Sequence, residues 1–578
     1  MPHRAHLFSL RISHAIRDVI SEGYSRSSLF KDLMAGCVVG VIAIPLAMAL
    51  AIASGVAPQY GLYTAIIAGF FIALTGGSRF SVSGPTAAFV VILHPLVTQH
   101  GLAGLLIASI MAGIILVAMA YARLGRFIEY IPEAVTLGFT GGIGIVIAVL
   151  QIPDLLGLSF GSMPEHFYQK ILIIATHIGN VDTGSVLVSA FTLSFMLLWP
   201  RLKTPIPAHL PAIIFASILA LLLNHYNFNI ATVGSRFQYV LPDGLLGSGI
   251  PPVLPHFEWP WTRTGINGVT ISLNWETIRD LIPAAFTIAM LGAIESLLCA
   301  VVLDGMSGKR HSANSELLGQ GIGNIITPFF GGITATAAIA RSAASFKAGA
   351  QSPIASIIHA FIVLLALVLL APILKYLPMP GLAAMLLVVA WNMSEAPKSV
   401  HLIKTSPASD IAVFIVCISL TVWFDMVISI STGIVLASIL FMREIATMTK
   451  RKDITHNKKF VPDSLPDSWK VIKINGPLFF AAADRVFGEL NEELKTLDGV
   501  ILHMEAVPIL DAGGLAALSR LMSAYKDSGK QILFAEWQFQ PLKTLARAKV
   551  APIDGEVRFF PSLDSAFENV LALKSEYL

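Results

Sequence analysis

Two segments rich in small residues combine residue types that suit anion binding. Thr75–Leu93 reads TGGSRFSVSGPTAAFVVIL, and Phe329–Gly349 reads FFGGITATAAIARSAASFKAG. Each has a Gly-Gly pair, then a short extended stretch, then a Thr-Ala-Ala that opens a short helix. A helix that begins inside a membrane exposes unpaired N–H groups and a positive dipole end, so an anion between two such ends satisfies both. The alternative is that Gly and Ala only allow close helix packing.

Glu295 is an ionisable residue inside an apolar run. The stretch FTIAMLGAIESLLCAVVLDG carries no other charge before Asp304. Because an ionised carboxylate is costly at membrane depth, such a residue is usually functional or paired. We expect Glu295 either to be protonated during a transport cycle or to bind a co-transported cation; the alternative is a neutral acid hydrogen-bonded to a neighbouring helix. Arg341, in the second small-residue segment, is expected either to attract the anion or to pair with a carboxylate.

Membrane-spanning helices would position these groups. The chain is 55% hydrophobic and 13% charged, with a mean hydropathy of +0.73, whereas soluble domains carry about 25% charged residues. Apolar runs, of which a full span needs roughly 20 residues, lie near 33–55, 62–76, 84–98, 102–121, 133–151, 184–199, 208–224, 281–303, 316–330, 335–346, 354–372, 380–393, 410–424 and 427–442. The two small-residue segments fall on the third and tenth runs. Broken helices at matching places in two halves are typical of inverted-repeat transporters.

The charges between the runs predict the orientation of the chain. Lys and Arg concentrate in alternate connections, which is the positive-inside pattern and places both termini in the cytoplasm. The net charge of +3 gives no indication of a nucleic acid partner. We find no Walker motif, nucleophilic triad or metal-ligand cluster, so we expect a secondary transporter without cofactor or metal, rather than an enzyme or an ATP-driven pump.

Composition divides the chain into four parts. We expect a cytoplasmic segment over 1–30, a transmembrane transport domain over 31–445, a basic linker over 446–466 and a soluble domain over 467–578. In the last part VIKINGPLFFAAA, GVILHME and KQILFAEW are typical of strands, and DRVFGELNEELKTL and GGLAALSRLMSAYKDSG of helices. This alternation predicts a small sheet packed by helices. Cys37, Cys299 and Cys417 lie in apolar runs and are expected to be buried thiols.

Four segments resemble the SulP family of anion transporters, the sulfate permease or solute carrier 26 family. They are DLMAGCVVGVIAIPLAMALA, GLYTAIIAGFFIALTGGSRFSVSGPTAA, AIESLLCAVVLDG and GNIITPFFGGITATAAIARSA. The resemblance implies an α-helical polytopic membrane protein of 14 spans, a 7+7 inverted repeat of the UraA-like type. A core of spans 1–4 and 8–11 would move like an elevator against a gate of spans 5–7 and 12–14.

The resemblance also implies which residues bind substrate and the coupling ion. The third and tenth helices would face each other across the substrate, with the site formed by Thr86, Ala87, Ala88, Phe89, Ala337, Ala338, Ile339, Ala340 and Arg341. Glu295 and Thr336 match positions that bind a cation in coupled relatives. Glu in place of Asp, and Cys299 in place of Thr, favour a proton over sodium.

One departure from the family pattern bears on the substrate. Many members have Gln or Glu after the proline of the first helix, where this chain has Leu46. Leu46, Met48 and Phe89 are therefore expected to line a roomier apolar wall that suits a carbon chain between two carboxylates. PLAMALAIASGVAPQYGLYTA, AMLGAIESLLCAVVLDGM and LDAGGL look especially close to the four-carbon dicarboxylate transporters of the family.

The C-terminal part resembles STAS, the sulfate transporter and anti-sigma antagonist module. Its signature loop is ILDAGGL, Ile509–Leu515. Related domains often carry a phosphorylatable Ser after the Asp, whereas this chain has Ala512, so switching by phosphorylation there is disfavoured. The resemblance implies a homodimer and a cytoplasmic protein partner for this domain.

These observations predict proton-coupled uptake of four-carbon dicarboxylates such as succinate, fumarate or aspartate across a bacterial inner membrane. The alternatives are a sulfate or bicarbonate permease of the same family, an anion channel, or a membrane-anchored sensor in which the STAS domain gives the output.

Overall fold

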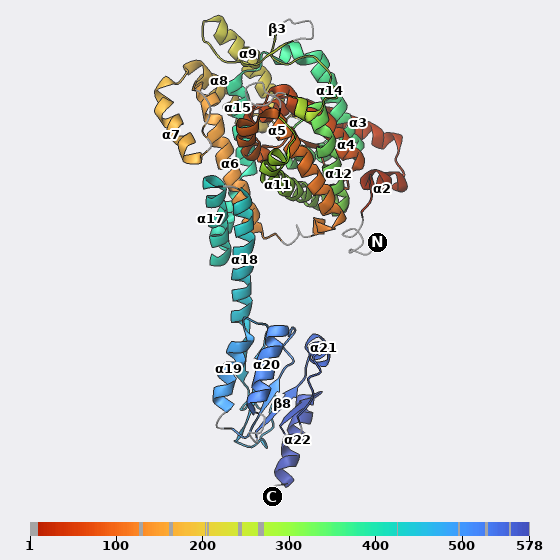
Figure 1. Ribbon diagram of the computed structural model, residues 1–578, viewed down its shortest axis with the longest axis vertical. Coiled ribbons are helices and arrows are strands. Elements are labelled where there is room, and N and C mark those ends of the chain that lie inside the picture. The colour runs from red at the N-terminus through yellow and green to blue at the C-terminus, as the bar shows by residue number, and fades with distance from the viewer. Residues whose placement is uncertain are drawn as a thin grey trace. The chain divides into compact units, whose positions relative to one another are not determined.

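The computed structural model describes residues 10–126, 131–160, 164, 166–202, 204, 207–240, 246–263, 271–424, 426–494, 497–525, 530–553 and 556–576. The chain forms two units, Met1–Ile434 and Val435–Leu578, and each is described by itself. The first unit consists almost entirely of helices, and the second combines a sheet with helices (Figure 1).

Every predicted apolar run overlaps a helix, and all of these helices lie in the first unit except α18, which continues into the second. The first half contains α2 (His14–Glu22), α3 (Arg26–Ala53), α4 (Pro58–Thr75), α5 (Ala87–Tyr121), α6 (Glu133–Leu156), α7 (Phe167–His177), α8 (Thr183–Leu198) and α9 (His209–His225). The second half contains α11 (Trp275–Ser307), α12 (Ala313–Ile326), α13 (Ile339–Lys347), α14 (Ile354–Leu374), α15 (Met379–Met393), α16 (Ala396–Thr405), α17 (Ala408–Trp423) and α18 (Met426–Met448). Of the described helices, nine are long and apolar enough to cross a membrane, and α9 and α17 are shorter apolar helices.

The third and fourth runs meet without a loop. They form α5, in which Gly101 has φ 65° and ψ −171°. This backbone conformation strongly favours glycine, because a side chain would clash there. The break leaves the first part of α5, Ala87–His100, as a short helix that ends inside a longer element.

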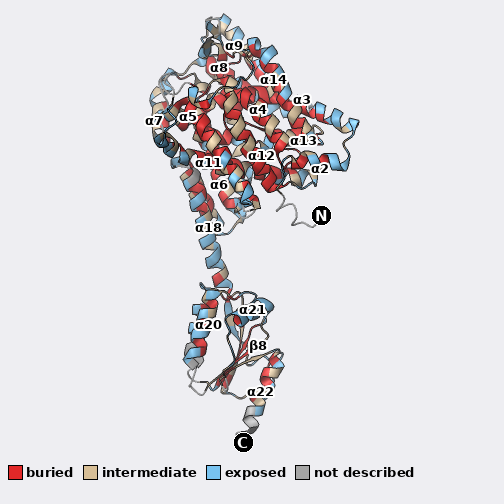
Figure 2. Ribbon diagram, turned by 45° about the vertical axis from the view of Figure 1, so that its right-hand side comes forward, coloured by how far each residue is buried: buried red, intermediate tan, exposed pale blue. Residues whose placement is uncertain are grey.

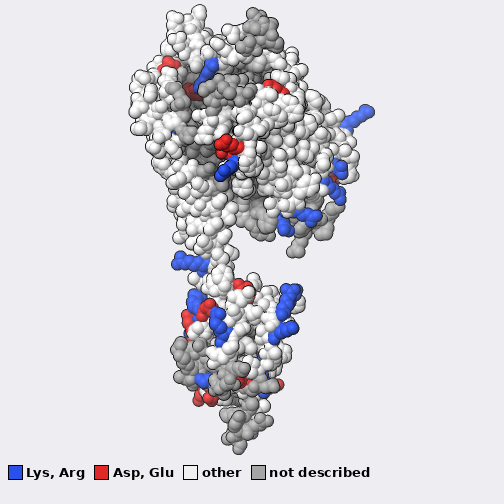
Figure 3. All heavy atoms as spheres, in the orientation of Figure 1, with Lys and Arg blue, Asp and Glu red and all other residues white. Residues whose placement is uncertain are grey.

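The helices of the first unit pack in two sets. One set joins α5 to α11 and α12, and α14 to α3 and α4; the other joins α6 to α15 and α17, and α8 to α9 and α15. Buried residues concentrate on the first set (Figure 2). The first set contains helices of the predicted core and the second contains helices of the predicted gate; the division into core and gate and their relative movement stay predictions. On the face in Figure 3, most of the first unit's surface carries no charged side chain, as expected of a protein surrounded by lipid.

The N-terminal helix α2 is tied to the set around α4. Ser13 and Ala15 donate backbone hydrogen bonds to the carbonyls of Thr75 and Gly76, at 2.9 and 3.3 Å. Glu22 accepts hydrogen bonds from Arg79 at 2.6 and 2.7 Å and lies 3.2 Å from the Lys309 ammonium. The Arg79 hydrogen bonds, followed by Lys309, lower the pKa of Glu22 to about 2.

We expect Glu22→Gln to loosen α2 without unfolding the protein. Because the folded pKa lies below the ordinary 4.5, the carboxylate stabilises the docked helix above that value, and the effect is lost as the pH falls towards about 2. Hydrogen exchange over residues 14–22 should rise several-fold in the variant at neutral pH, while exchange in α12 stays unchanged. Equal protection of α2 in both proteins would contradict this role.

The second unit contains a five-stranded sheet in the order β5-β6-β7-β8-β9. Its strands are β5 (Lys450–Asp453), β6 (Trp469–Asn475), β7 (Gly499–His503), β8 (Gln531–Ala535) and β9 (Val557–Phe560), of which only β5 runs antiparallel to its neighbour. α19 (Ala483–Leu494), α20 (Ala512–Tyr525) and α21 (Phe539–Arg547) cover one face, and α22 (Leu563–Glu576) the other. The predicted sheet packed by helices is confirmed.

Candidate anion-binding site

Two short strands bring the starts of the two half-helices together. β1 (Ser83–Gly84) pairs antiparallel with β4 (Thr336–Ala337), with Ser83 opposite Ala337 and Gly84 opposite Thr336. The Ala338 N–H extends the pairing by donating to the Val82 carbonyl at 3.0 Å. Two residues separate β1 from α5 and one residue, Ala338, separates β4 from α13; Thr86 and Ala338 are the N-cap residues.

Neither N-cap side chain accepts a hydrogen bond from the N–H groups of the first helical turn. Thr86 and Ala338 have extended backbones, and no side-chain cap hydrogen bond forms at either position. Alanine has no capping group, and the Thr86 hydroxyl bonds elsewhere. The N–H groups of the first turns therefore receive no capping oxygen, which is the condition that anion binding at a helix start requires.

The Thr86 hydroxyl connects the first half-helix to α11. It donates to Glu295 Oε2 at 2.9 Å, so the ionisable side chain predicted to couple transport lies at the start of α5. The Thr86 side chain is buried, while Glu295 is partly exposed. Directly after Glu295 in α11, Ser296 shares a hydrogen bond of 2.5 Å with Thr336, and Thr336 also donates to the Gly292 carbonyl at 3.2 Å. Glu295 thus contacts the start of α5, and Thr336 joins the strand before α13 to α11.

Arg341 spans from α13 to the start of α5. Its side chain is buried and donates from Nη2 to the Pro85 carbonyl at 2.7 Å, while Nε and Nη1 have no hydrogen-bond partner among the described residues. A Cβ placed on Gly84 would lie 2.8 Å from Nη1, so glycine makes room for the guanidinium. The described ion pairs include none between Arg341 and a carboxylate. The unpaired donors are available to an anion, and the choice between the two expected roles stays a prediction.

The predicted site residues differ in exposure. Ala87, Ala88, Phe89 and Ala337 are buried; Ala338 is partly buried; Ile339 and Ala340 are exposed. Phe89 packs on α11, since a Cβ on Gly292 would lie 3.5 Å from its ring. The expected open wall of Leu46, Met48 and Phe89 is wrong for this conformation, because all three side chains are buried in packed helices.

Polar residues that the sequence analysis did not select hold the extended segments in place. Glu316 of α12 accepts the N–H groups of Gly77 and Ser78 at 3.0 and 2.9 Å and the Gln320 amide at 3.1 Å. Asn324 does the same for Ala335, accepting its N–H at 2.8 Å and donating to its carbonyl at 2.9 Å. Buried polar atoms in an apolar run were the available signal, since such atoms need partners.

We expect Glu316→Ala to destabilise the first unit by about 3 kcal/mol, because it leaves buried N–H groups without an acceptor. Thermal unfolding of the detergent-solubilised protein would measure the loss. Glu316→Gln is the matched control: it keeps the shape and one acceptor oxygen, so its melting temperature should fall less. Equal melting temperatures for the Ala variant and the native protein would contradict the positioning role.

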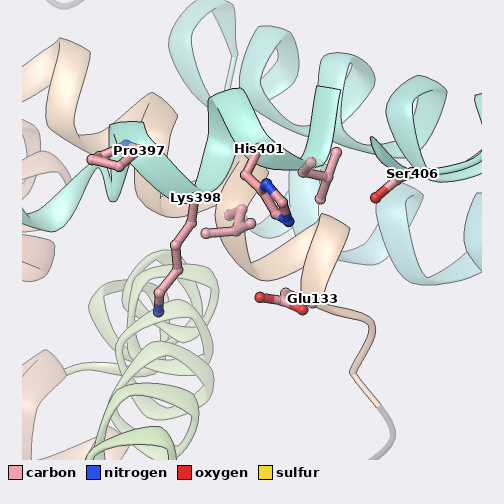
Figure 4. A pocket seen from close by; sticks show the side chains of 7 residues that line it. Glu133, Pro397, Lys398, His401 and Ser406 are labelled. Atoms are coloured by element: carbon pink, nitrogen blue, oxygen red, sulfur yellow. The ribbon is translucent and has the colours of Figure 1, made fainter. Parts of the chain in front are cut away.

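A pocket separate from the half-helices opens between α6 and α16. It is lined by Glu133, Leu137, Pro397, Lys398, His401, Leu402 and Ser406 (Figure 4). None of these residues belongs to β1, β4 or the first turns of α5 and α13. We therefore do not assign the substrate to this pocket.

One group of side chains in the second unit has the composition of a metal site. The ligand atoms of His503, Glu505 and Glu536 lie within 4.8 Å of one another. However, His503 Nε2 is 2.6 Å from Glu536, and the Lys473 ammonium is 2.8 Å from Glu505 and lowers the pKa of that carboxyl. The charges of this group are already paired within the protein, so the group does not call for an ion.

Comparison with family models decides the class of protein. A model described as the sulfate permease family matches residues 29–419, and a STAS domain model matches residues 463–566. The chain belongs to the sulfate permease family. It is therefore an anion transporter, a multi-pass membrane protein with a C-terminal STAS domain, and not an enzyme.

Individual relatives agree with this family. "Putative sulfate transporter YvdB" of Bacillus subtilis is 37% identical, with 94% of this chain and 98% of the relative covered. Bicarbonate transporter BicA of Picosynechococcus is 24% identical, covering 90% of each chain. The murine Slc26a9 anion transporter in its inward-facing state has the same fold, with a TM-score of 0.82, 17% identity, and 97% and 94% of the two chains covered. These names do not show the predicted closeness to dicarboxylate transporters, so the substrate stays a proposal.

Proposed function

We propose that the protein of the sulfate permease family described above imports small organic dianions, four-carbon dicarboxylates such as succinate, fumarate and aspartate, together with protons. The observation that carries the proposal is the Thr86–Glu295 hydrogen bond of 2.9 Å at an uncapped helix start. It places a protonatable carboxyl beside backbone N–H groups that can receive an anion. Protonation of Glu295 would remove the like charge that opposes the substrate.

The proposed site lies between the starts of α5 and α13. Ala87 and Ala88 of α5 and Ile339 and Ala340 of α13 would offer backbone N–H groups, and the unpaired Nε and Nη1 of Arg341 would offer further donors. Ala337 and Ala338, whose N–H groups are bonded to Ser296 and Val82, would shape the crossing. Phe89 would support the site from behind. Glu295 and Thr336 would hold the coupling ion, a proton in preference to sodium.

The substrate proposal rests on the sequence at Leu46, which follows Pro45 in α3 where many family members have Gln or Glu. Because Leu46 is buried in this conformation, it would meet the substrate only in another state of the transport cycle. Without a polar side chain there, a compact inorganic anion would lose a hydrogen bond, whereas a carbon chain tolerates an apolar neighbour. The named relatives favour a second candidate, transport of sulfate or bicarbonate. We further propose a bacterial inner membrane location with cytoplasmic termini, a homodimer, elevator-like movement of the set around α5, and a cytoplasmic protein partner for the STAS domain.

Uptake by proteoliposomes tests these proposals. Labelled succinate should accumulate above its equilibrium level when the outside is made acidic, and unlabelled fumarate and aspartate should compete better than sulfate or bicarbonate. Competition by sulfate or bicarbonate alone would replace the dicarboxylate proposal with the second candidate. Flux that never exceeds equilibrium would indicate a channel.

A further inference from the structure

His359 is a fully buried imidazole in the middle of α14. The residue has an exposed fraction of 0%, and neither ring nitrogen has a hydrogen-bond partner among the described residues. Buried polar side chains in folded proteins almost always have a partner, so each exception requires an explanation. An apolar side chain of similar size would avoid this cost.

The imidazole lies beside the half-helix crossing. A Cβ on Gly69 of α4 would lie 3.6 Å from His359 Nδ1 and 3.4 Å from the Ser83 carbonyl oxygen of β1. One turn earlier on α14, the Ser356 hydroxyl donates to the Ser81 carbonyl at 2.7 Å. The imidazole therefore stands next to the strand that carries the start of α5.

Few charges surround this position. The helices that α14 packs against most closely are α3 and α4. On α3 the titratable residues Arg26, Lys31, Asp32 and Cys37 all precede Gly40, which touches α14 beside His359. The Asp32 carboxylate accepts hydrogen bonds from the Tyr24 and Ser352 hydroxyls. On α4, Tyr60 and Tyr63 lie about two turns before Gly69.

Arg341 brings a positive charge to the same strand, since a Cβ on Gly84, the residue after Ser83, would lie 2.8 Å from its Nη1. When no anion is bound, the positive charge of Arg341 disfavours a second positive charge on His359. A bound anion offsets the guanidinium, and the imidazolium then becomes favourable.

We propose that His359 is a second proton site of the transport cycle, occupied when the anion is bound and vacated when it leaves. The proposal rests on the proposed proton-coupled import of dianions. One proton on Glu295 and one on an imidazole nitrogen of His359 balance the two negative charges of a dicarboxylate, so the loaded core moves no net charge. Both protons leave on the side where the dianion is released.

The number of coupled protons gives the test. With the membrane potential held at zero, each coupled proton multiplies the accumulation ratio by about tenfold per unit of pH difference. The native full-length protein in proteoliposomes should therefore concentrate succinate about 100-fold per pH unit, and His359→Gln about tenfold. His209→Gln, a histidine substitution on α9, is the matched control and should behave as the native protein.

The outcomes separate the inference from the function on which it rests. A native protein that shows no pH-driven accumulation would overturn the proposed function itself. A tenfold native ratio, or a 100-fold ratio unchanged in His359→Gln, would overturn only the role of His359. If His359→Gln does not fold, proton uptake on succinate binding is measured for Glu295→Gln in detergent: about one proton per succinate supports His359, and none excludes it.

Discussion

Glu295→Gln is expected to reduce pH-driven accumulation of succinate at least tenfold while the protein remains folded. Glutamine keeps the size of the side chain and an oxygen that can accept from Thr86, whose hydroxyl lies 2.9 Å from the native carboxylate. It cannot gain or lose a proton, so one coupled proton disappears from each cycle. Exchange of substrate across the membrane without a gradient should continue, because the helix starts are unchanged.

The measurement is labelled succinate uptake into proteoliposomes at several imposed pH differences. Glu276→Gln is the matched control, since Glu276 lies exposed in the first turn of the same helix and its replacement should leave the slope unchanged. Full proton-coupled accumulation by Glu295→Gln would refute the role given to this carboxyl.

Ala338→Trp is expected to lower the affinity for substrate by at least about 100-fold, because the indole would cover the N–H groups at the start of α13. Ala338 is partly buried at the junction of β4 and α13, with φ −93° and ψ 114°. This extended conformation accepts any residue except proline without strain, so the change should act on the site rather than on the backbone.

Binding of succinate to the purified protein measures this effect, with the melting temperature as a check on folding. Lys347→Trp adds the same side chain at an exposed position in the last turn of α13 and should bind as the native protein does. Undiminished affinity in Ala338→Trp would mean that the anion binds elsewhere.

The broken helices were predictable from local chemistry. Gly-Gly pairs followed by extended residues and Thr-Ala-Ala predict a helix that begins late, and the structure begins α5 at Ala87 and α13 at Ile339. In the second segment the triplet precedes the helix rather than opening it, because Thr336 and Ala337 pair as β4. The sheet of the second unit was predictable for the same reason, since alternating apolar runs and turn residues report on local structure.

Contacts between distant segments were not predictable. Arg341 donates to the Pro85 carbonyl and Glu316 accepts from Gly77, and in both contacts the two residues are more than 200 positions apart in the sequence. The lack of a hydrogen-bond partner for His359 depends on all the described residues around it. The prediction that Leu46, Met48 and Phe89 form an open apolar wall was wrong for a related reason. The sequence shows that these residues are apolar, but not whether they face a cavity or pack against other helices. α7 and α16 were also missed, because neither lies in a long apolar run.

The pairing of β1 with β4 has a consequence for the affinity of the site on the two sides of the membrane. Backbone hydrogen bonds between β1 and β4 join the two halves of the repeat, so separating the halves would break these bonds. The anion site between α5 and α13 should therefore keep the same shape whichever side of the membrane it faces. The protein should then bind its substrate with the same affinity on either side of the membrane when the pH and the potential are the same. Direction of transport would come from the gradients alone, and reversing them should turn the importer into an exporter.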